Sequence, residues 1–240
     1  MKPILIIKTG VTVKTAYVQE GDFERWIIDT MQGEDENFSV VEVFRDEKLP
    51  LHDSVAGVVV TGSPAMVTDK LDWSEYTADW LRHALVTRLP ILGICYGHQL
   101  LAHALGGEVD FHPKGREIGT TRVSLLENSS EDSLFSGSES PFLVHVSHMQ
   151  SVVRLPAGAE VLGSNEFEAY HAVRFAENVW GLQFHPEFSE TAMRAYISER
   201  QETLQEEGLD VEELLKQISP TPVAEKLMHR FHTLIKDHSV

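Results

Sequence analysis

In the first half of the chain, apolar runs alternate with segments in which apolar residues recur at a longer spacing. Predominantly apolar runs, typical of central parallel strands buried on both faces, predict four strands. These strands cover Ile4–Ile7, Val40–Phe44, Val55–Thr61 and Pro90–Ile94. Segments with apolar residues at helical spacing separate the strands. These predicted helices cover Phe23–Met31, Asp72–Arg88 and Gln99–Leu105.

Local signals mark the ends of two of these helices. Asp72 and Glu75 are expected to form a capping pair at the start of the helix over residues 72–88. Gly106 and Gly107 are expected to end the helix that precedes them. The order of elements predicts an α/β fold with a doubly wound, mostly parallel sheet.

The pattern changes from Glu108 to about Phe184, where short β-like segments are separated by Gly, Pro, Asn and Ser. The expected strands cover Thr120–Leu126, Phe142–Val146, Glu160–Ser164, Tyr170–Phe175 and Val179–Phe184. We expect them to add antiparallel strands to the parallel sheet.

The last part of the chain is predicted to be helical. One helix covers Glu190–Glu207, and a final helix begins at Pro222 with Thr221 as its N-cap. We therefore predict one domain over residues 1–205 and a helical C-terminal extension over residues 206–240. Apolar positions on one face of the final helix imply that it packs on the body or on a partner. They are Val223, Leu227, Phe231 and Leu234.

Composition and charge argue against several classes of function. The 240 residues are enough for a sizeable core, and 20 Lys and Arg against 37 Asp and Glu give a net charge of −17. This charge argues against nucleic acid and anionic membranes as partners. No apolar run has the length of a membrane span or of a signal-peptide core, so a cytoplasmic location is expected.

The single cysteine cannot form an internal disulfide, but its context points to chemistry. Cys95 stands in Gly93-Ile94-Cys95-Tyr96-Gly97, directly between a predicted strand and a predicted helix. A nucleophile elbow has this arrangement, because glycines on both sides allow a sharp, strained turn. The helix N-terminus favours the thiolate, and the N–H of Tyr96 is placed to face an oxyanion. The alternative is a buried core cysteine. Such cysteines are common in proteins, but they do not require glycines on both sides or a position between a strand and a helix.

A base and an orienting carboxylate follow the last predicted strand. His185 and Glu187 lie two residues apart in an extended segment, so their side chains project on the same side. Pro186 between them fixes its own φ and favours an extended backbone at His185. A surface turn is the alternative for His-Pro-Glu alone, but together with Cys95 the segment predicts a Cys-His-Glu triad.

A third segment, Thr61-Gly62-Ser63-Pro64, follows the third predicted strand. Strand ends at the carboxyl edge of a doubly wound sheet face a common crevice. Gly62 would let a backbone N–H approach a developing oxyanion there. An ordinary Gly-Ser-Pro turn is the alternative.

These segments resemble the class I, triad-type glutamine amidotransferase family. Residues 93–99 resemble its nucleophile motif, residues 183–187 its His-x-Glu motif, and residues 61–64 lie where it carries its oxyanion loop. The resemblance covers about residues 1–200 and implies a flavodoxin-like fold that hydrolyses the glutamine side-chain amide. It implies a γ-glutamyl thioester on Cys95, His185 as base and acid, and Glu187 as its orienter.

The resemblance also implies residues that hold the substrate. Gly62 and Tyr96 match the oxyanion hole. The positions expected to hold the amino-acid head group are Ser63, Gln99 and the segment Ser147-His148-Met149-Gln150.

Within the family, the chain most resembles the glutaminase domain of GMP synthase and its stand-alone relatives. It departs from that domain in two places. Ser147-His148-Met149-Gln150 replaces Ser-His-Gly-Asp, and Gly62-Ser63-Pro64 replaces Gly-Gly-Pro. These differences weaken the inference of a GMP synthase partner and leave the thioester chemistry unaffected.

The sequence contains no phosphate-binding loop and no ATP-pyrophosphatase motif, so either a separate synthetase receives the ammonia or hydrolysis is the whole reaction. We expect no cofactor and no metal. The pairs His145/His148 and His229/His232 lack the spacing of known metal motifs, and the second pair is expected to be solvated.

Three functions remain open. The first is a glutaminase, either standing alone or serving as the amidotransferase component of a larger enzyme. The second is a γ-glutamyl peptide hydrolase on the same fold, since Lys114–Gly119 resembles a segment of such stand-alone proteins. The third is a non-catalytic binding or regulatory module, against which the intact triad argues.

Overall fold

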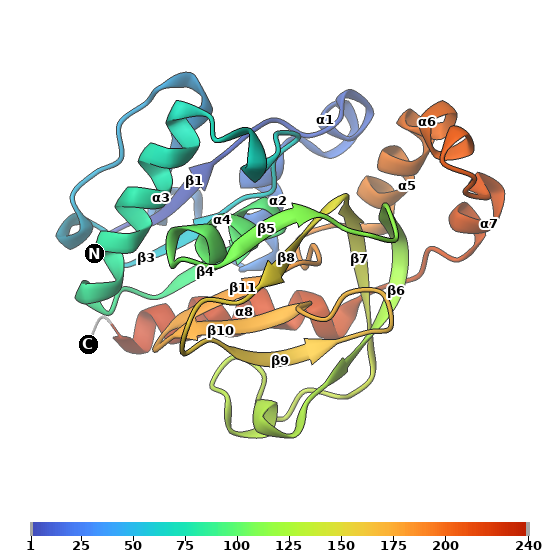
Figure 1. Ribbon diagram of the computed structural model, residues 1–240. Helices are drawn as coiled ribbons and strands as arrows, with labels where there is room; N and C mark the ends of the chain where they lie inside the picture. Colours follow the sequence, from blue (N-terminus) through green and yellow to red (C-terminus); the bar gives the residue numbers. More distant parts are fainter. Residues whose placement is uncertain (1, 239–240) are drawn as a thin grey trace.

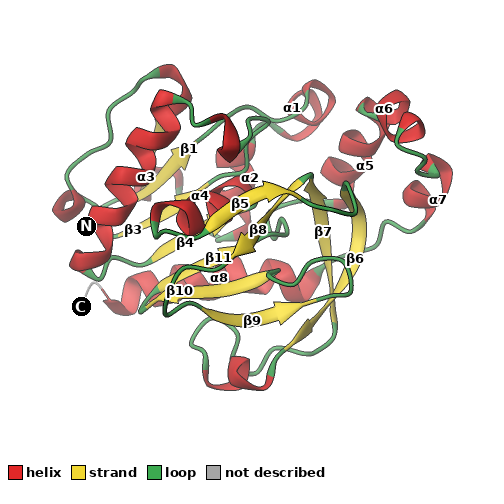
Figure 2. Ribbon diagram, viewed as in Figure 1, coloured by secondary structure: helices red, strands yellow, loops and turns green. Residues whose placement is uncertain are grey.

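The computed structural model describes residues 2–238, and a nine-stranded sheet forms its centre (Figures 1 and 2). The strand order is β2-β1-β3-β4-β11-β10-β9-β6-β7. The bounds of these strands are β1 Ile4–Lys8, β2 Phe38–Glu42, β3 Gly57–Val60, β4 Ile91–Ile94, β6 Glu117–Leu125, β7 Phe142–His148, β9 Glu160–Ser164, β10 Ala172–Ala176 and β11 Val179–Leu182. Two further strands, β5 Glu108–Phe111 and β8 Gln150–Arg154, pair with each other in a small separate sheet.

The sheet has a parallel half and an antiparallel half that meet at β11. Strands β2, β1, β3 and β4 are parallel, and β11 pairs in parallel with β4. On its other side β11 pairs antiparallel with β10, and the ladder stays antiparallel through β9, β6 and β7. The predicted fold class is confirmed, although β11 was expected only as an added antiparallel strand.

Helices cover both faces of the parallel half, which makes the sheet the middle of three layers. The helices are α1 Lys14–Glu20, α2 Phe23–Thr30, α3 Asp72–Ala84, α4 Tyr96–Ala104, α5 Glu190–Glu199, α6 Gln201–Glu206, α7 Val211–Lys216 and α8 Pro222–His238. Apolar side chains of α2 and α8 form one core with Ile4, Ile6 and Leu92. Those of α3 and α4 form a second core with Leu5 and Val60 on the opposite face.

A third apolar cluster lies at the end of the molecule where α5, α6 and α7 gather (Figure 1). Phe23 and Trp26 of α2 meet Phe188 and Tyr196 there, with ring centroids 4.7 to 6.5 Å apart. Such aromatic packing buries large apolar areas in fixed geometry. This cluster holds α5 against the end of the sheet that carries Cys95.

The final helix packs on the body of the protein. Leu227, Phe231 and Ile235 are buried, and Nδ1 of His232 lies 2.7 Å from the carbonyl oxygen of Met31. The prediction that His232 is solvated is therefore wrong, because α8 turns this residue toward α2. His229 is exposed. The boundary between residues 205 and 206 stays a prediction.

Several element ends differ from those expected. Helix α3 has Leu71 as its N-cap, with no side-chain cap, so the Asp72–Glu75 capping pair is wrong. Glu75 instead meets Nε2 of His103 at 2.9 Å. Arg200 interrupts the helix expected over residues 190–207. The hydroxyl of Thr221, the expected N-cap of the final helix, makes no hydrogen bond to any described residue.

Helix α1 and strands β5 and β8 were not predicted. Between residues 2 and 238, no helix combines the length and the apolar composition that crossing a bilayer requires.

Candidate active site

The turn between β4 and α4 holds Cys95 in a strained backbone conformation. Its φ is +50° and its ψ is −98°, a region that residues with a side chain rarely adopt. A Cβ on Gly97 would lie 2.5 Å from the Val60 carbonyl oxygen, and one on Gly93 would lie 2.5 Å from the Gly97 backbone. Both glycines are therefore needed for the turn to pack against β3, as in a nucleophile elbow.

Backbone contacts fix the nucleophile at this turn. The Cys95 N–H donates to the Leu182 carbonyl of β11 at 2.7 Å, and its Sγ lies 3.9 Å from the Ser147 carbonyl oxygen. Cys95 is mostly buried but lines a cavity of about 260 Å³. Because α4 begins at Tyr96, Cys95 lies at the positive end of the helix dipole.

His185 and Glu187 form a buried pair beside Cys95. Nδ1 of His185 lies 2.7 Å from Oε1 of Glu187, and the His185 N–H donates to the His145 carbonyl at 2.8 Å. The Phe188 ring stacks on the imidazole with centroids 4.0 Å apart. The structure thus brings the three residues of the predicted triad together.

The charge of the imidazole follows from these neighbours. Burial lowers the pKa of His185, but the charges of Glu187 and the Cys95 thiolate, with hydrogen bonds to both, raise it to about 10. A neighbouring negative charge favours the protonated ring. These neighbours therefore make the His185 ring a stronger base, able to take up the thiol proton, while the Glu187 carboxylate accepts a hydrogen bond from Nδ1.

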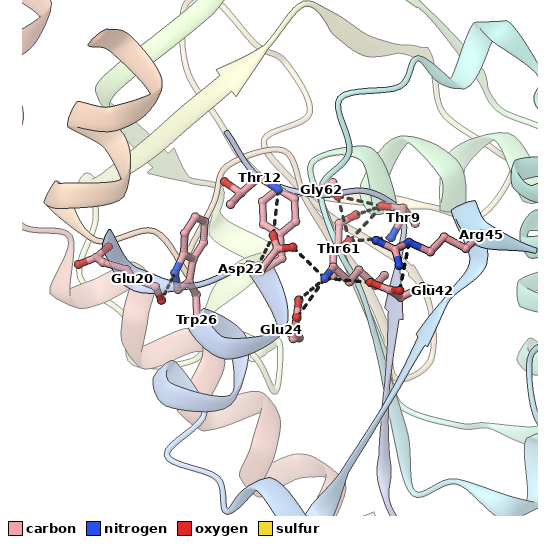
Figure 3. A network of polar contacts seen from close by, with 12 residues as sticks. Thr9, Thr12, Glu20, Asp22, Glu24, Trp26, Glu42, Arg45, Thr61 and Gly62 are labelled. Carbon is pink, nitrogen blue, oxygen red and sulfur yellow. Dashed lines mark hydrogen bonds and ion pairs between the residues drawn. The ribbon is translucent and has the colours of Figure 1, made fainter. Parts of the chain in front are cut away.

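The loop after β3, which contains Gly62, lies close to the His185 imidazole, and hydrogen bonds to the Gly62 carbonyl hold it in place. A Cβ on Gly62 would lie 2.9 Å from Cε1 of His185. The Gly62 carbonyl accepts from Thr9 Oγ1 at 2.8 Å and from Thr61 Oγ1 at 2.9 Å (Figure 3). The two hydroxyls thereby determine how the peptide between Gly62 and Ser63 is oriented.

A buried ion cluster supports the neighbouring loop. Lys8 Nζ lies 2.8 Å from Asp22, 3.0 Å from Glu24 and 3.2 Å from Glu42. Asp22 Oδ1 accepts from the Thr12 N–H at 2.9 Å (Figure 3). Thr12 lines the Cys95 cavity, and its hydroxyl meets Tyr196 Oη at 3.0 Å. The cluster therefore fixes one wall of the cavity.

The predicted substrate-binding residues line the same cavity as Cys95, Tyr96 and His185. They are Ser63, Gln99, Ser147, His148 and Met149, together with Gln150. Their roles stay predictions.

Protein contacts occupy most of these side chains, including Gln150, whose Nε2 donates to Thr68 Oγ1 at 2.6 Å, and Met149, whose Sδ accepts from Arg116 at 3.0 Å. Ser63 Oγ donates to the Thr9 carbonyl at 2.7 Å, and Gln99 Nε2 donates to the Gln150 carbonyl at 2.7 Å. His148 Nε2 lies 2.9 Å from the buried carboxylate of Glu117. A substrate therefore meets side chains that are already held in place.

Polar residues that were not predicted as part of the site also line this cavity, among them Arg116, Tyr196 and Arg200. Tyr196 and Arg200 come from the end of α5, about a hundred residues after the nucleophile, and no local motif marks them. In the described part of the chain, no group of three or more His, Cys, Asp or Glu side chains is arranged so that it could hold a metal ion.

The chain is similar to known proteins in sequence and in fold. The family model "Glutamine amidotransferase class-I" matches residues 19–202. GMP synthase [glutamine-hydrolyzing] from Porphyromonas gingivalis is 34% identical over 205 residues, which cover 83% of this chain and 37% of that protein. The chain thus spans little more than a third of the length of this relative.

A shorter relative covers more of its own length. It is one of the subunits of GMP synthase [glutamine-hydrolyzing] from Sulfolobus acidocaldarius, and it is 38% identical over 146 residues, 60% of this chain and 72% of that one.

Solved structures share the fold. A glutamine amidotransferase from Methylobacillus flagellatus has a TM-score of 0.80 at 22% identity, over 99% of this chain and 95% of that one. One from Thermotoga maritima has a TM-score of 0.76 at 21% identity, over 98% of both chains. Because the family model matches most of the chain, the protein belongs to the class I glutamine amidotransferases.

Proposed function

We propose that this protein hydrolyses the side-chain amide of glutamine to glutamate and ammonia through a γ-glutamyl thioester on Cys95. The observation that carries this proposal is the contact between Cys95, His185 and Glu187 at a cavity wall. A thiol, a base and an orienting carboxylate in this order are the parts that covalent acyl transfer requires.

The proposed reaction has two halves. The thiol proton passes to His185, the Cys95 sulfur attacks the amide carbon, and the C–N bond breaks as His185 returns the proton to the leaving ammonia. Water, deprotonated by His185, then attacks the thioester and releases glutamate and the free thiol. Glu187 holds the ring in one orientation and stabilises its positive charge throughout.

Two backbone N–H groups are proposed to stabilise the oxyanion. One is that of Tyr96, the first residue of α4. The other comes from the loop Gly62–Ser63, whose joining peptide is trans, because the only cis peptide in the described chain is Ser140–Pro141. With the Gly62 carbonyl turned toward Thr9 and Thr61, the Ser63 N–H points the opposite way, and Ser63 lines the cavity.

We further propose that a separate synthetase in the cytoplasm takes up the ammonia. The support is the similarity to the Sulfolobus acidocaldarius relative, which is named as one subunit of a glutamine-hydrolysing GMP synthase. The chain itself carries no motif for activating an acceptor with ATP.

A γ-glutamyl peptide hydrolase is the second candidate. The observation that favours it is the Arg200 guanidinium, which lines the cavity and has no anionic partner in the described structure. The thioester step would be the same, with an amino acid in place of ammonia as the leaving group.

One assay tests the proposal. Purified protein is incubated with glutamine, γ-glutamylcysteine and glutathione, while ammonia and free amines are measured. Ammonia release from glutamine that is lost in Cys95→Ala supports the proposal, and peptide cleavage without glutaminase activity supports the second candidate. Activity that survives in Cys95→Ala contradicts the mechanism for either substrate.

A further inference from the structure

Arg200 occupies an unusual place at the active-site cavity. It lies at the junction between α5 and α6 and lines the cavity together with Cys95 and Arg116. Its Nη1 atom is buried and makes no hydrogen bond to any described residue. Buried charged groups in proteins are normally paired, so an unpaired guanidinium at a cavity needs an explanation.

The nearby carboxylates are already engaged by other groups. Glu199 accepts from the backbone N–H groups of Lys14 and Thr15, at 3.1 and 2.8 Å, at the start of α1. Glu207 binds Arg116 through two hydrogen bonds of 2.8 and 3.0 Å. Arg200 therefore forms no ion pair with an acidic side chain among the described residues, although it lies at the cavity wall.

The guanidinium is nevertheless held in place. It lies over the Tyr196 ring, 4.6 Å from the centroid, and the Tyr196 hydroxyl is hydrogen-bonded to Thr12 at 3.0 Å. Cation–π contact with a fixed ring orients the planar fork without neutralising it. The group is thus arranged in advance for an anion that the protein does not supply.

Electrostatics agree with this arrangement. Burial lowers the pKa of Arg200 and the neighbouring Arg116 lowers it further, and together these two effects outweigh the opposing effects of Tyr196, Glu199 and Cys95. An anion bound at Arg200 would offset both effects.

We propose that Arg200 binds a carboxylate of the substrate and so sets which γ-glutamyl compounds the Cys95 site accepts. This inference rests on the proposed function, because it takes the cavity as the substrate site. Guanidinium and carboxylate are both planar and form paired hydrogen bonds, which makes arginine well suited to this recognition. In a net acidic protein, such a cation also attracts an anionic substrate locally.

Two substrate carboxylates have this chemistry. One is the α-carboxylate of the γ-glutamyl group, which glutamine also carries. The other is the C-terminal carboxylate of an amino acid attached to the γ-glutamyl group. Three substrates separate them: glutamine and γ-glutamyl methylamide carry only the first, and γ-glutamylglycine carries both.

The experiment compares Arg200→Gln with Arg200→Lys and with the control Arg194→Gln in the full chain. Arg194 lies on the same helix, is exposed, and donates to the Leu215 carbonyl outside the cavity. We expect Arg200→Gln to raise KM roughly ten- to a hundred-fold with little change in kcat, and Arg200→Lys to restore part of the loss. A loss on all three substrates identifies the α-carboxylate, and a loss on γ-glutamylglycine alone identifies the C-terminal one.

A binding measurement keeps this inference separate from catalysis. Kd values for glutamine and γ-glutamylglycine are measured on Cys95→Ala with and without Arg200→Gln, and thermal unfolding verifies that each variant is folded. A ten-fold or greater weakening by Arg200→Gln supports the proposal even if no hydrolysis is found. Unchanged Kd and KM for all substrates, no binding at all, or an equal effect of Arg194→Gln would overturn it.

Discussion

Nδ1 of His185 lies 2.7 Å from Oε1 of Glu187, with only Pro186 between the two residues in the chain. Both side chains are buried, and the His185 backbone is bonded to His145 on β7. A short rigid segment thus supplies both the base and its orienting group. The behaviour of this pair allows two predictions.

Glu187→Gln is expected to lower kcat about 10²- to 10⁴-fold while the protein stays folded. The amide is nearly the same size as the carboxylate but cannot stabilise the imidazolium or reliably select its tautomer. Steady-state kinetics with glutamine measure the loss, and circular dichroism verifies the fold. Activity within a factor of a few of the wild type would show that Glu187 does not act through His185.

The pair also predicts how stability depends on pH. The pKa of His185 is raised to about 10 in the folded protein, from an unfolded value of about 6.5. Protonated His185 therefore contributes stability that is complete below about pH 6.5 and is lost as pH rises through about 10. Urea unfolding across this range should show the difference between wild type and Glu187→Gln shrinking as pH rises. A difference that grows with pH would refute the assignment.

Gly62→Ala is expected to reduce kcat/KM about 10- to 100-fold. The added Cβ would lie 2.9 Å from Cε1 of His185, so the imidazole or the oxyanion loop must shift. Misplacement of a catalytic group by about 1 Å can cost a factor of this size. Kinetics and urea unfolding are measured together, and wild-type kcat/KM in a folded variant would rule out the close approach.

Asp22→Asn is expected to lower the free energy of unfolding by about 3 kcal/mol, because it leaves the buried Lys8 ammonium without its shortest ion pair. Asp29→Asn is the control, since Asp29 pairs with Arg25 on an exposed helix surface and should cost under about 1 kcal/mol. Urea unfolding measures both. Equal losses would show that the buried cluster contributes no more than a surface pair.

Local sequence was sufficient to predict the two segments that carry the candidate catalytic residues. The elbow around Cys95 and the segment from His185 to Glu187 are each determined within a few residues, by glycine or proline geometry and by the adjoining apolar strands. Strands β1, β3 and β4 were also predicted, since burial on both faces leaves a clear apolar run. The edge strand β2 is only partly buried, and its prediction lay two residues too late. The predicted strand ends in this half differ from the observed ends by at most two residues, where turns rather than burial decide.

Features that depend on contacts between distant segments were not predictable. Helix α1 receives its N-terminal acceptor from Glu199, which no pattern near Lys14 reveals. The polar side chain of His232 suggested a solvated position, but its partner is the backbone carbonyl of Met31, directly after α2. Arg200 enters the cavity for the same reason, through the packing of Tyr196 in the third apolar cluster.

The position of β11 determines when a reactive thiol can exist. During synthesis, Cys95 leaves the ribosome well before β11, yet its N–H is bonded to Leu182 of that strand and its base follows three residues later. A nascent chain therefore carries an ordinary cysteine, without a charged partner, until β11 inserts between β4 and β10. The arrangement of Cys95 beside His185 and Glu187 is thus confined to molecules whose central sheet has already formed.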